Sequence, residues 1–304
     1  MQILDTQDNE FDLSVIVPVY NAAGHLERLT KEVFALGREG LRCQMIYIDD
    51  NSTDESLAIL HDLLLRYPDM TVTTNRGGRG AGIARNFGWP YARGRFTLFF
   101  DADDILHRNV LVSVIRQMDA DPQINLGFCT YRFEREKTAS FAEMGYDDEK
   151  IVEALLKDRP SATGNIVEMA PLLVFSNYPW NKLLRTKHYR KVGMRFGRTM
   201  VNNDILGHWY CLLLAGKITV LNEVICTHIV HPTGGNLTNI SGEGRLALFE
   251  ALEETYDFLE SLPYLRKQFS SYFWELTEGL AYAAQRKMDP PLNQEFQTLY
   301  TRLL

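Results

Sequence analysis

Residues 13–20 read LSVIVPVY, an apolar and β-branched run that stops at the turn-forming Asn21. A run of this kind, bounded by a turn, is typical of a strand buried in a parallel sheet. Apolar residues then recur at helical spacing between His25 and Leu36, which predicts a helix with one apolar face. The chain therefore opens with a buried strand followed by a helix that can cover the sheet.

The alternation of strand and helix continues for about a hundred residues. Further strands are predicted at residues 44–49, 70–74 and 95–100, with a helix at about 55–66 and another just after the glycine-rich loop 76–82. Strands that alternate with helices over short connections indicate a parallel sheet covered on both faces. The expected fold class is therefore α/β, with a mostly parallel central sheet flanked by helices and a small helical C-terminal region.

Composition restricts the classes of function. The 304-residue chain carries 39 acidic and 32 basic side chains, a net charge of −7, so nucleic acid is not an expected partner. Four widely spaced cysteines without a CxxC pair argue against a zinc cluster or a disulfide framework. The acidic start does not resemble a secretory signal, and no apolar run approaches the roughly 18 residues of a bilayer span. We expect a cytoplasmic protein, and peripheral contact with the inner membrane face stays open.

The densest acidic cluster follows the strand at 95–100 and consists of Asp101, Asp103 and Asp104. Carboxylates this close repel one another, and a hard divalent cation such as Mg²⁺ or Mn²⁺ would relieve that repulsion. The alternative is a helix N-cap with extra acid near the helix dipole, and Asp104 alone could serve that purpose. We favour metal binding for the cluster as a whole.

Two more polar segments follow strands. Asp50 lies at a strand end, where its carboxylate could accept hydrogen bonds from a nucleobase or a ribose, although a capping turn over residues 49–54 would also explain the segment. Residues 75–86 combine glycines, which let a ligand approach the backbone, with arginines that can bind anions. This loop lacks the P-loop ending and the dinucleotide fingerprint, so a flexible surface turn is the alternative.

Histidines and aromatic residues of the second half offer weaker signals. His228 and His231, near Gly234 and Gly235, could complete a metal or phosphate site, although single histidines more often have structural partners. Three aromatic side chains could stack on a sugar face or pack in the core, namely Tyr178, Trp180 and Trp209.

Taken together, the segments resemble the family 2 inverting glycosyltransferases, which have the glycosyltransferase A fold. The matching text, in order, is SVIVPVYNAAGHL, YIDDNSTDES, GAGIARNFG, FTLFFDADDIL, PWNKLLRTKHYRKVGMRF, NNDILGHWYCLLLAGKITVLNEVICTHIV and GGNLTN. It spans about Leu13 to Asn239 and leaves the tail after Ser241 outside. The resemblance implies transfer of a sugar from a nucleotide diphosphate sugar to a hydroxyl of an acceptor glycan. UDP-sugars are common donors in the family, and surface polysaccharide assembly is its common use.

The resemblance also implies roles for individual residues. The positions that match donor-binding residues are Pro18, Tyr20, Asp50, Arg85, Asp101 and Asp103. The expected ligands of Mn²⁺ or Mg²⁺ are Asp103, Asp104 and His231. Asp204 matches the carboxylate that usually serves as catalytic base, although the family often has Glu-Asp where this chain has Asn203 before Asp204.

The expected organisation follows from the same match. A catalytic domain would span residues 1–240, with a nucleotide-sugar half at about 12–120 and an acceptor half at about 121–240, and a helical extension would follow at 241–304. The acceptor would be a glycan or a lipid-linked glycan, and the oligomeric state stays open.

Two other functions compete with this interpretation. A sugar nucleotidyltransferase also uses metal-bound aspartates, but its glycine-rich loop normally follows the first strand directly, where this chain has Val19, Tyr20 and Asn21. A catalytically inactive module that binds sugar nucleotides or glycans is the other alternative. The intact acidic cluster and Asp204 argue against it.

Overall fold

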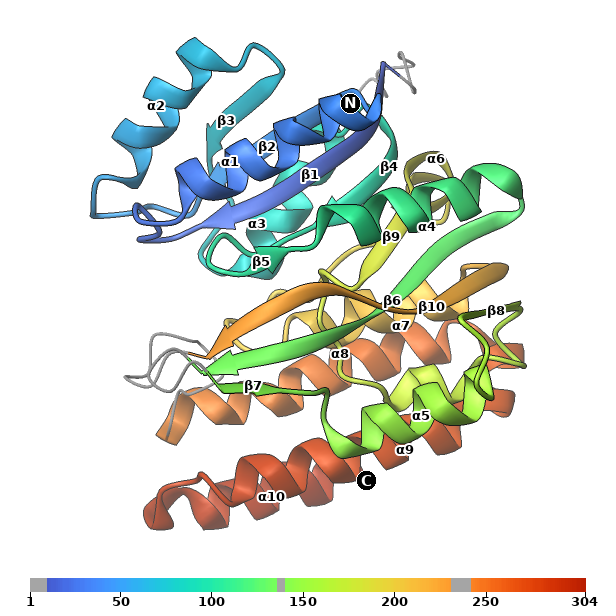
Figure 1. The fold of residues 1–304 in the computed structure, drawn as a ribbon. Coiled ribbons are helices and arrows are strands. Elements are labelled where there is room, and N and C mark those ends of the chain that lie inside the picture. The colour runs from blue at the N-terminus through green and yellow to red at the C-terminus, as the bar shows by residue number, and fades with distance from the viewer. Residues whose placement is uncertain (1–9, 136–139, 231–241) are drawn as a thin grey trace.

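The computed structural model describes residues 10–135, 140–230 and 242–304. Within these ranges ten strands form one sheet, whose main path runs β3-β2-β1-β4-β9-β6-β10-β5. Helices lie on both faces of the sheet, and helices from the end of the chain pack beside its second half (Figure 1). The predicted α/β class, with a helix-flanked sheet and a helical tail, is confirmed.

The N-terminal half is the parallel part of the sheet. β1 pairs in parallel with both β2 and β4, and β2 pairs in parallel with β3. The strands form because their apolar runs are buried almost throughout. The elements are β1 (Phe11–Val19), α1 (Leu26–Phe34), η1 (Ala35–Glu39), β2 (Cys43–Asp49), α2 (Ser56–Arg66), β3 (Met70–Thr74), α3 (Ala81–Gly88), η2 (Trp89–Tyr91) and β4 (Gly94–Phe99).

The second half makes the sheet mixed. β9 lies antiparallel between β4 and β6 and thereby joins the two halves, while β10 runs parallel to β6. Residues 144–165 contain both a helix and a strand. The elements are β5 (Ile105–Leu106), α4 (Arg108–Ala120), β6 (Ile124–Arg135), β7 (Ser140–Ala142), α5 (Tyr146–Leu156), β8 (Ser161–Gly164), η3 (Ala170–Val174), β9 (Lys182–Arg185), α6 (Thr186–Lys191), α7 (Asp204–Leu213) and β10 (Lys217–Val230).

The C-terminal helices pack on the second half of the sheet domain. Phe258 of α8 stacks on Tyr210 of α7 at 3.7 Å between ring centroids, and Phe273 of α9 meets Trp209 edge-on at 5.6 Å. Apolar side chains of these helices are therefore covered by the same chain. The elements are η5 (Gly242–Leu246), α8 (Ala247–Glu260), α9 (Pro263–Gln285), η6 (Pro290–Leu292) and α10 (Asn293–Leu303). The predicted boundary at residues 240 and 241 lies outside the described residues.

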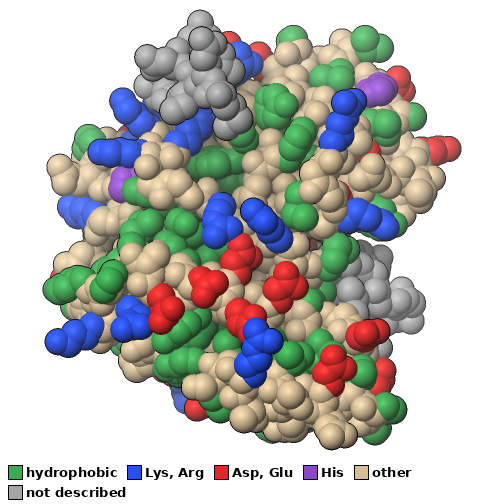
Figure 2. All heavy atoms as spheres, turned by 180° about the vertical axis from the view of Figure 1, so that it is seen from behind, with side chains coloured by type: hydrophobic (Ala, Val, Ile, Leu, Met, Phe, Trp, Pro, Cys, Tyr) green, Lys and Arg blue, Asp and Glu red, His purple; other side chains and the backbone are tan. Residues whose placement is uncertain are grey.

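The outer surface mixes charges of both signs. On the face opposite that of Figure 1, acidic side chains gather in the lower half with Lys and Arg side chains beside them (Figure 2). Glu254 of α8 pairs with Arg195, and Glu260 pairs with Arg266. No helix in the described part of the chain has the length and apolar character needed to cross a bilayer.

Candidate active site

The carboxyl ends of three neighbouring strands form the edge of the candidate site. β1, β2 and β4 are adjacent and parallel, so Asn21, Asp50 and Asp101 follow strands that end at the same edge of the sheet. The Asn21 side chain accepts a hydrogen bond from the backbone N–H of Thr53 at 2.8 Å, which ties the first two strand ends together. Open parallel sheets commonly bind ligands at such an edge.

Asp50 holds the glycine-rich loop. Its buried carboxylate accepts hydrogen bonds from Asn75 Nδ2 and from the backbone N–H of Gly80, both at 2.7 Å. Gly80 has a φ of 119°, a conformation that favours glycine. The turn before α2 is instead braced by Asp54, which accepts a hydrogen bond from Ser56 N–H at 2.9 Å. Asp50 therefore shapes the loop, while a contact with a nucleotide stays a prediction.

Tyr20 offers an aromatic surface at the same edge. The side chain is 51% exposed, and the Arg79 guanidinium of the glycine-rich loop lies 5.1 Å from its ring centroid. Pro18, two residues earlier in β1, is partly buried. A planar ring beside a cation suits stacking on a nucleobase next to a diphosphate.

Arg85 of α3 joins the two halves of the chain. One guanidinium nitrogen donates to Asp101 Oδ1 at 2.7 Å, and the other donates to Asp204 Oδ1 at 2.5 Å and to Asn203 Oδ1 at 3.1 Å. The arginine side chain is only 3% exposed, whereas those of Asp101 and Asp204 are 29% and 24% exposed. Two predicted site residues from separate segments, Asp101 and Asp204, thus meet around a third, the buried Arg85.

The acidic turn after β4 divides into two parts. Asp103 is partly exposed, but Asp104 is fully buried and its carboxylate accepts hydrogen bonds from His228 Nδ1 and Ile229 N–H, both at 2.9 Å. Burial raises the pKa of Asp104 to about 6, although the hydrogen bond from His228 opposes the rise. Helix α4 has His107 at its N-cap, so Asp104 does not cap it.

Sequence reasoning missed the residue that anchors this turn. Arg28 of α1 donates to the carbonyl oxygens of Asp103 and Asp104, at 3.2 and 2.8 Å. An arginine in an otherwise ordinary amphipathic helix gives no sequence signal for this role, because the contact spans about 75 residues.

A divalent metal fits the oxygen donors of the turn only in part. Among the described residues no group of three or more His, Cys, Asp and Glu side chains could by itself hold a metal ion. Mg²⁺ and Mn²⁺ sites that use one or two carboxylates, with phosphate oxygens and water completing the shell, need no such group. Asp103 has the chemistry for that kind of site, whereas the carboxylate of Asp104 is turned to His228. His231, Gly234 and Gly235 lie outside the described residues.

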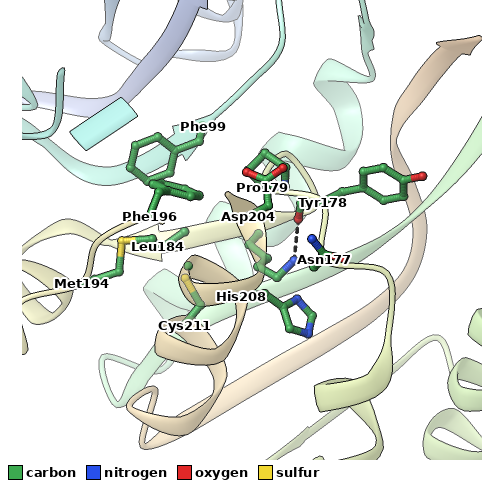
Figure 3. Close-up of a pocket in the computed structure, with 12 residues that line it drawn as sticks. Phe99, Asn177, Tyr178, Pro179, Leu184, Met194, Phe196, Asp204, His208 and Cys211 are labelled. Atoms are coloured by element: carbon green, nitrogen blue, oxygen red, sulfur yellow. Dashed lines mark hydrogen bonds between the residues drawn. The ribbon is translucent and has the colours of Figure 1, made fainter. Parts of the chain in front are cut away.

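Below Asp204 the protein interior contains a small cavity of about 10 Å³, room for at most one water molecule. Apolar side chains gather on one side of it and Asn177 and His208 lie on the other (Figure 3). Lys182, a second residue that sequence reasoning missed, lines it and donates to Tyr178 O at 2.5 Å and Asn181 Oδ1 at 2.7 Å. Lys182 is the first residue of β9, whose short sequence KLLR gives little indication that the lysine is buried.

Several groups around the cavity have shifted pKa values. Burial lowers the pKa of Lys182 to about 8 and holds that of His208 well below its ordinary value. Desolvation raises the pKa of Asp204 above its ordinary value, and the positive charge of Arg85 opposes this rise. A raised pKa makes a carboxylate a better proton acceptor, as a general base must be.

The aromatic residues serve the core more than the surface. Trp180 and Trp209 are fully buried, so for these two the packing alternative is correct. Tyr178 is partly exposed and stacks on Trp180 with ring centroids 4.5 Å apart.

Comparison with known proteins shows several curated relatives that share part of this chain. The chain is 32% identical over 111 residues to the minor teichoic acid biosynthesis protein GgaB of Bacillus subtilis. The match covers 36% of this chain and 12% of GgaB, so this chain spans only a small part of that relative.

Solved structures agree in fold. S. aureus TarS in complex with UDP-GlcNAc has a TM-score of 0.70 at 16% identity, over 96% of this chain and 80% of that chain. Mannosyltransferase PcManGT from Pyrobaculum calidifontis, in complex with GDP-Man and Mn²⁺, has a TM-score of 0.56 at 16% identity, over 97% and 81%. Residues 14–196, more than half of the chain, match the family model for glycosyl transferase family 2. The chain belongs to glycosyl transferase family 2.

Proposed function

We propose that the protein transfers a sugar from a UDP-sugar to a hydroxyl of an acceptor glycan, with inversion at the anomeric carbon. The observation that carries the proposal is the meeting of Asp101 and Asp204 at Arg85. One carboxylate belongs to the predicted donor edge and the other to the predicted acceptor half. Both reactants could therefore be held against a single cluster of charges.

The donor would bind along the strand ends. Tyr20 offers an exposed ring for the base, and the loop braced by Asp50 brings backbone N–H groups and arginines toward a diphosphate. TarS shares this fold and was solved in complex with UDP-GlcNAc, which supports a UDP-sugar as the donor. GDP-sugars are the second candidate, because PcManGT was solved with GDP-Man.

A divalent metal would be held by Asp103, with Asp104 kept in the interior by His228. When bound, such an ion neutralises charge on the leaving diphosphate. The chain itself contributes the fixed position of the turn, because Arg28 holds two of its carbonyl groups. The Mn²⁺ in the PcManGT complex supports this cofactor.

Asp204 would be the catalytic base. Inverting transfer is a single displacement, so the acceptor hydroxyl attacks from the face opposite the diphosphate and needs a base there. Asp204 is the first residue of α7, and the helix and its packing against the tail fix its backbone. The acceptor would be a glycan or lipid-linked glycan in surface polysaccharide synthesis, a role that the similarity to GgaB, a teichoic acid biosynthesis protein, supports.

The products distinguish this proposal from its closest alternative. The purified protein is first screened against UDP-, GDP- and dTDP-sugars with Mn²⁺ by thermal shift, because a ligand of the native state raises the melting temperature. Released nucleotide is then identified by chromatography. A transferase releases nucleoside diphosphate from a nucleotide sugar. Pyrophosphate released from a nucleoside triphosphate and a sugar phosphate would instead indicate a nucleotidyltransferase, and no turnover of any sugar nucleotide would indicate a binding module.

A further inference from the structure

Arg85 forms a hydrogen bond with the carboxylate of Asp204, the proposed base. The guanidinium contacts Asp204 Oδ1, one of the two oxygens to which an acceptor proton would go. An opposite charge in contact favours the ionised carboxylate and makes it a weaker proton acceptor. Through this contact Arg85 opposes the uptake of a proton by Asp204.

The same guanidinium has unused capacity to bind an anion. Arg85 is almost completely buried, and its Nε–H has no hydrogen-bond partner among the described residues. A buried donor without a partner carries a free-energy cost that a ligand acceptor could remove. The guanidinium carbon lies 5.2 Å from the centroid of the Phe196 ring, which places an aromatic face against the cation.

Asp101 links Arg85 to the edge where the donor is proposed to bind. Arg85 donates a hydrogen bond to Asp101, just after the end of β4. The glycine-rich loop that precedes α3 is held at the same edge by Asp50. A diphosphate brought to this edge carries more negative charge than one carboxylate and matches the planar fork of arginine. It would compete with Asp204 for Arg85.

We propose that Arg85 is a charge latch, which the diphosphate of the donor draws away from Asp204, so that the base becomes available only after the donor binds. The inference rests on the proposed function, since it needs a nucleotide diphosphate and Asp204 as base. It assigns Arg85 the role of a positioning residue, which acts on the reaction through Asp204.

A double-mutant cycle on nucleotide affinity tests the latch without any measurement of transfer. UDP, with GDP as a second probe, is titrated by calorimetry in the presence of Mn²⁺ into wild type, Asp204→Asn, Arg85→Gln and the double variant. Because Asp204 competes for the guanidinium, Asp204→Asn should bind the nucleotide about 5- to 150-fold more tightly than wild type. In the Arg85→Gln background the same change should alter affinity by less than about 2-fold.

Two further variants keep the test decisive. Asp148→Asn removes another buried acidic group of the acceptor half, one held by Tyr131 and Ser176 rather than by Arg85, and should leave nucleotide affinity unchanged. Arg85→Lys replaces the Gln variant if the latter does not fold, because a lysine keeps the charge but cannot fork between two carboxylates. In that background the gain from Asp204→Asn should shrink.

The outcomes distinguish a failure of the latch from a failure of the proposed function. Wild-type affinity in Asp204→Asn, an equal gain in both Arg85 backgrounds, or the same gain in Asp148→Asn would overturn the latch and leave the proposed transferase standing. Failure of wild type to bind either nucleotide would overturn the proposed function and the latch with it.

Discussion

Gly82 of α3 packs against the segment that leads into Asp204, and its replacement by alanine should displace that segment. A Cβ at Gly82 would lie 2.3 Å from Gly197 O and 2.7 Å from Asn203 Cβ. Relief of these contacts requires a movement of about 1 Å, given the normal separation of non-bonded atoms. Asn203 directly precedes Asp204, and the Gly197 N–H is hydrogen-bonded to the Asn203 carbonyl, so a shift of this size should lower turnover by about 10²-fold.

Gly279→Ala is the matched control, because Gly279 also lies in a helix but a Cβ there meets nothing within 4 Å. The control should gain up to about 1 kcal/mol of stability from helix propensity. Gly82→Ala should instead lose about 1–3 kcal/mol from overpacking. Denaturant unfolding and steady-state turnover are measured on both variants. A Gly82→Ala protein with the stability gain of the control and normal turnover would refute the close packing between α3 and the Asp204 segment.

Three other predictions concern charged groups. Lys182→Met removes an ammonium whose pKa is lowered to about 8 by burial. Because the unfolded chain keeps that proton to about pH 10.4, the free energy of unfolding of wild type should rise by about 3 kcal/mol relative to the variant between pH 8 and 10.4. Urea unfolding measures this difference, and a pH-independent difference would contradict the prediction. Asp50→Ala should weaken UDP binding by about 1–3 kcal/mol in calorimetry because it frees Gly80 and the loop, and unchanged affinity would remove Asp50 from the donor site. Excess chelator should abolish transfer and Mn²⁺ or Mg²⁺ restore it, and full activity in chelator would exclude the metal at Asp103.

The parallel half of the fold is predictable because its signals are local. β1, β2 and β4 are short apolar runs buried on both faces, and each begins within two residues of its predicted position. The family and the helical tail are also confirmed. In contrast, β6 and β10 mix apolar, polar and charged residues and shift register against each other, so no single period marks them.

The site is less predictable because its contacts are distant in sequence. Asp50, Arg85, Asp101 and Asp204 are individually visible as polar residues after strands or within motifs, but the contact between Arg85 and Asp204 spans 119 residues. The partner of Asp104 is His228, 124 residues away, and only the fold reveals that this carboxylate faces the interior. Which carboxylates are exposed to a ligand is therefore a property of packing.

Turnover of Asp204→Asn tests the central claim most directly. Asparagine keeps the shape of the side chain but cannot serve as a base. With a donor identified by the nucleotide-sugar screen, transfer should fall by about 10²–10⁴-fold. The melting temperature should stay close to that of wild type, and nucleotide binding should be at least as tight. Near-normal turnover in this folded, nucleotide-binding variant would contradict the assignment of Asp204 as the base and with it the proposed mechanism.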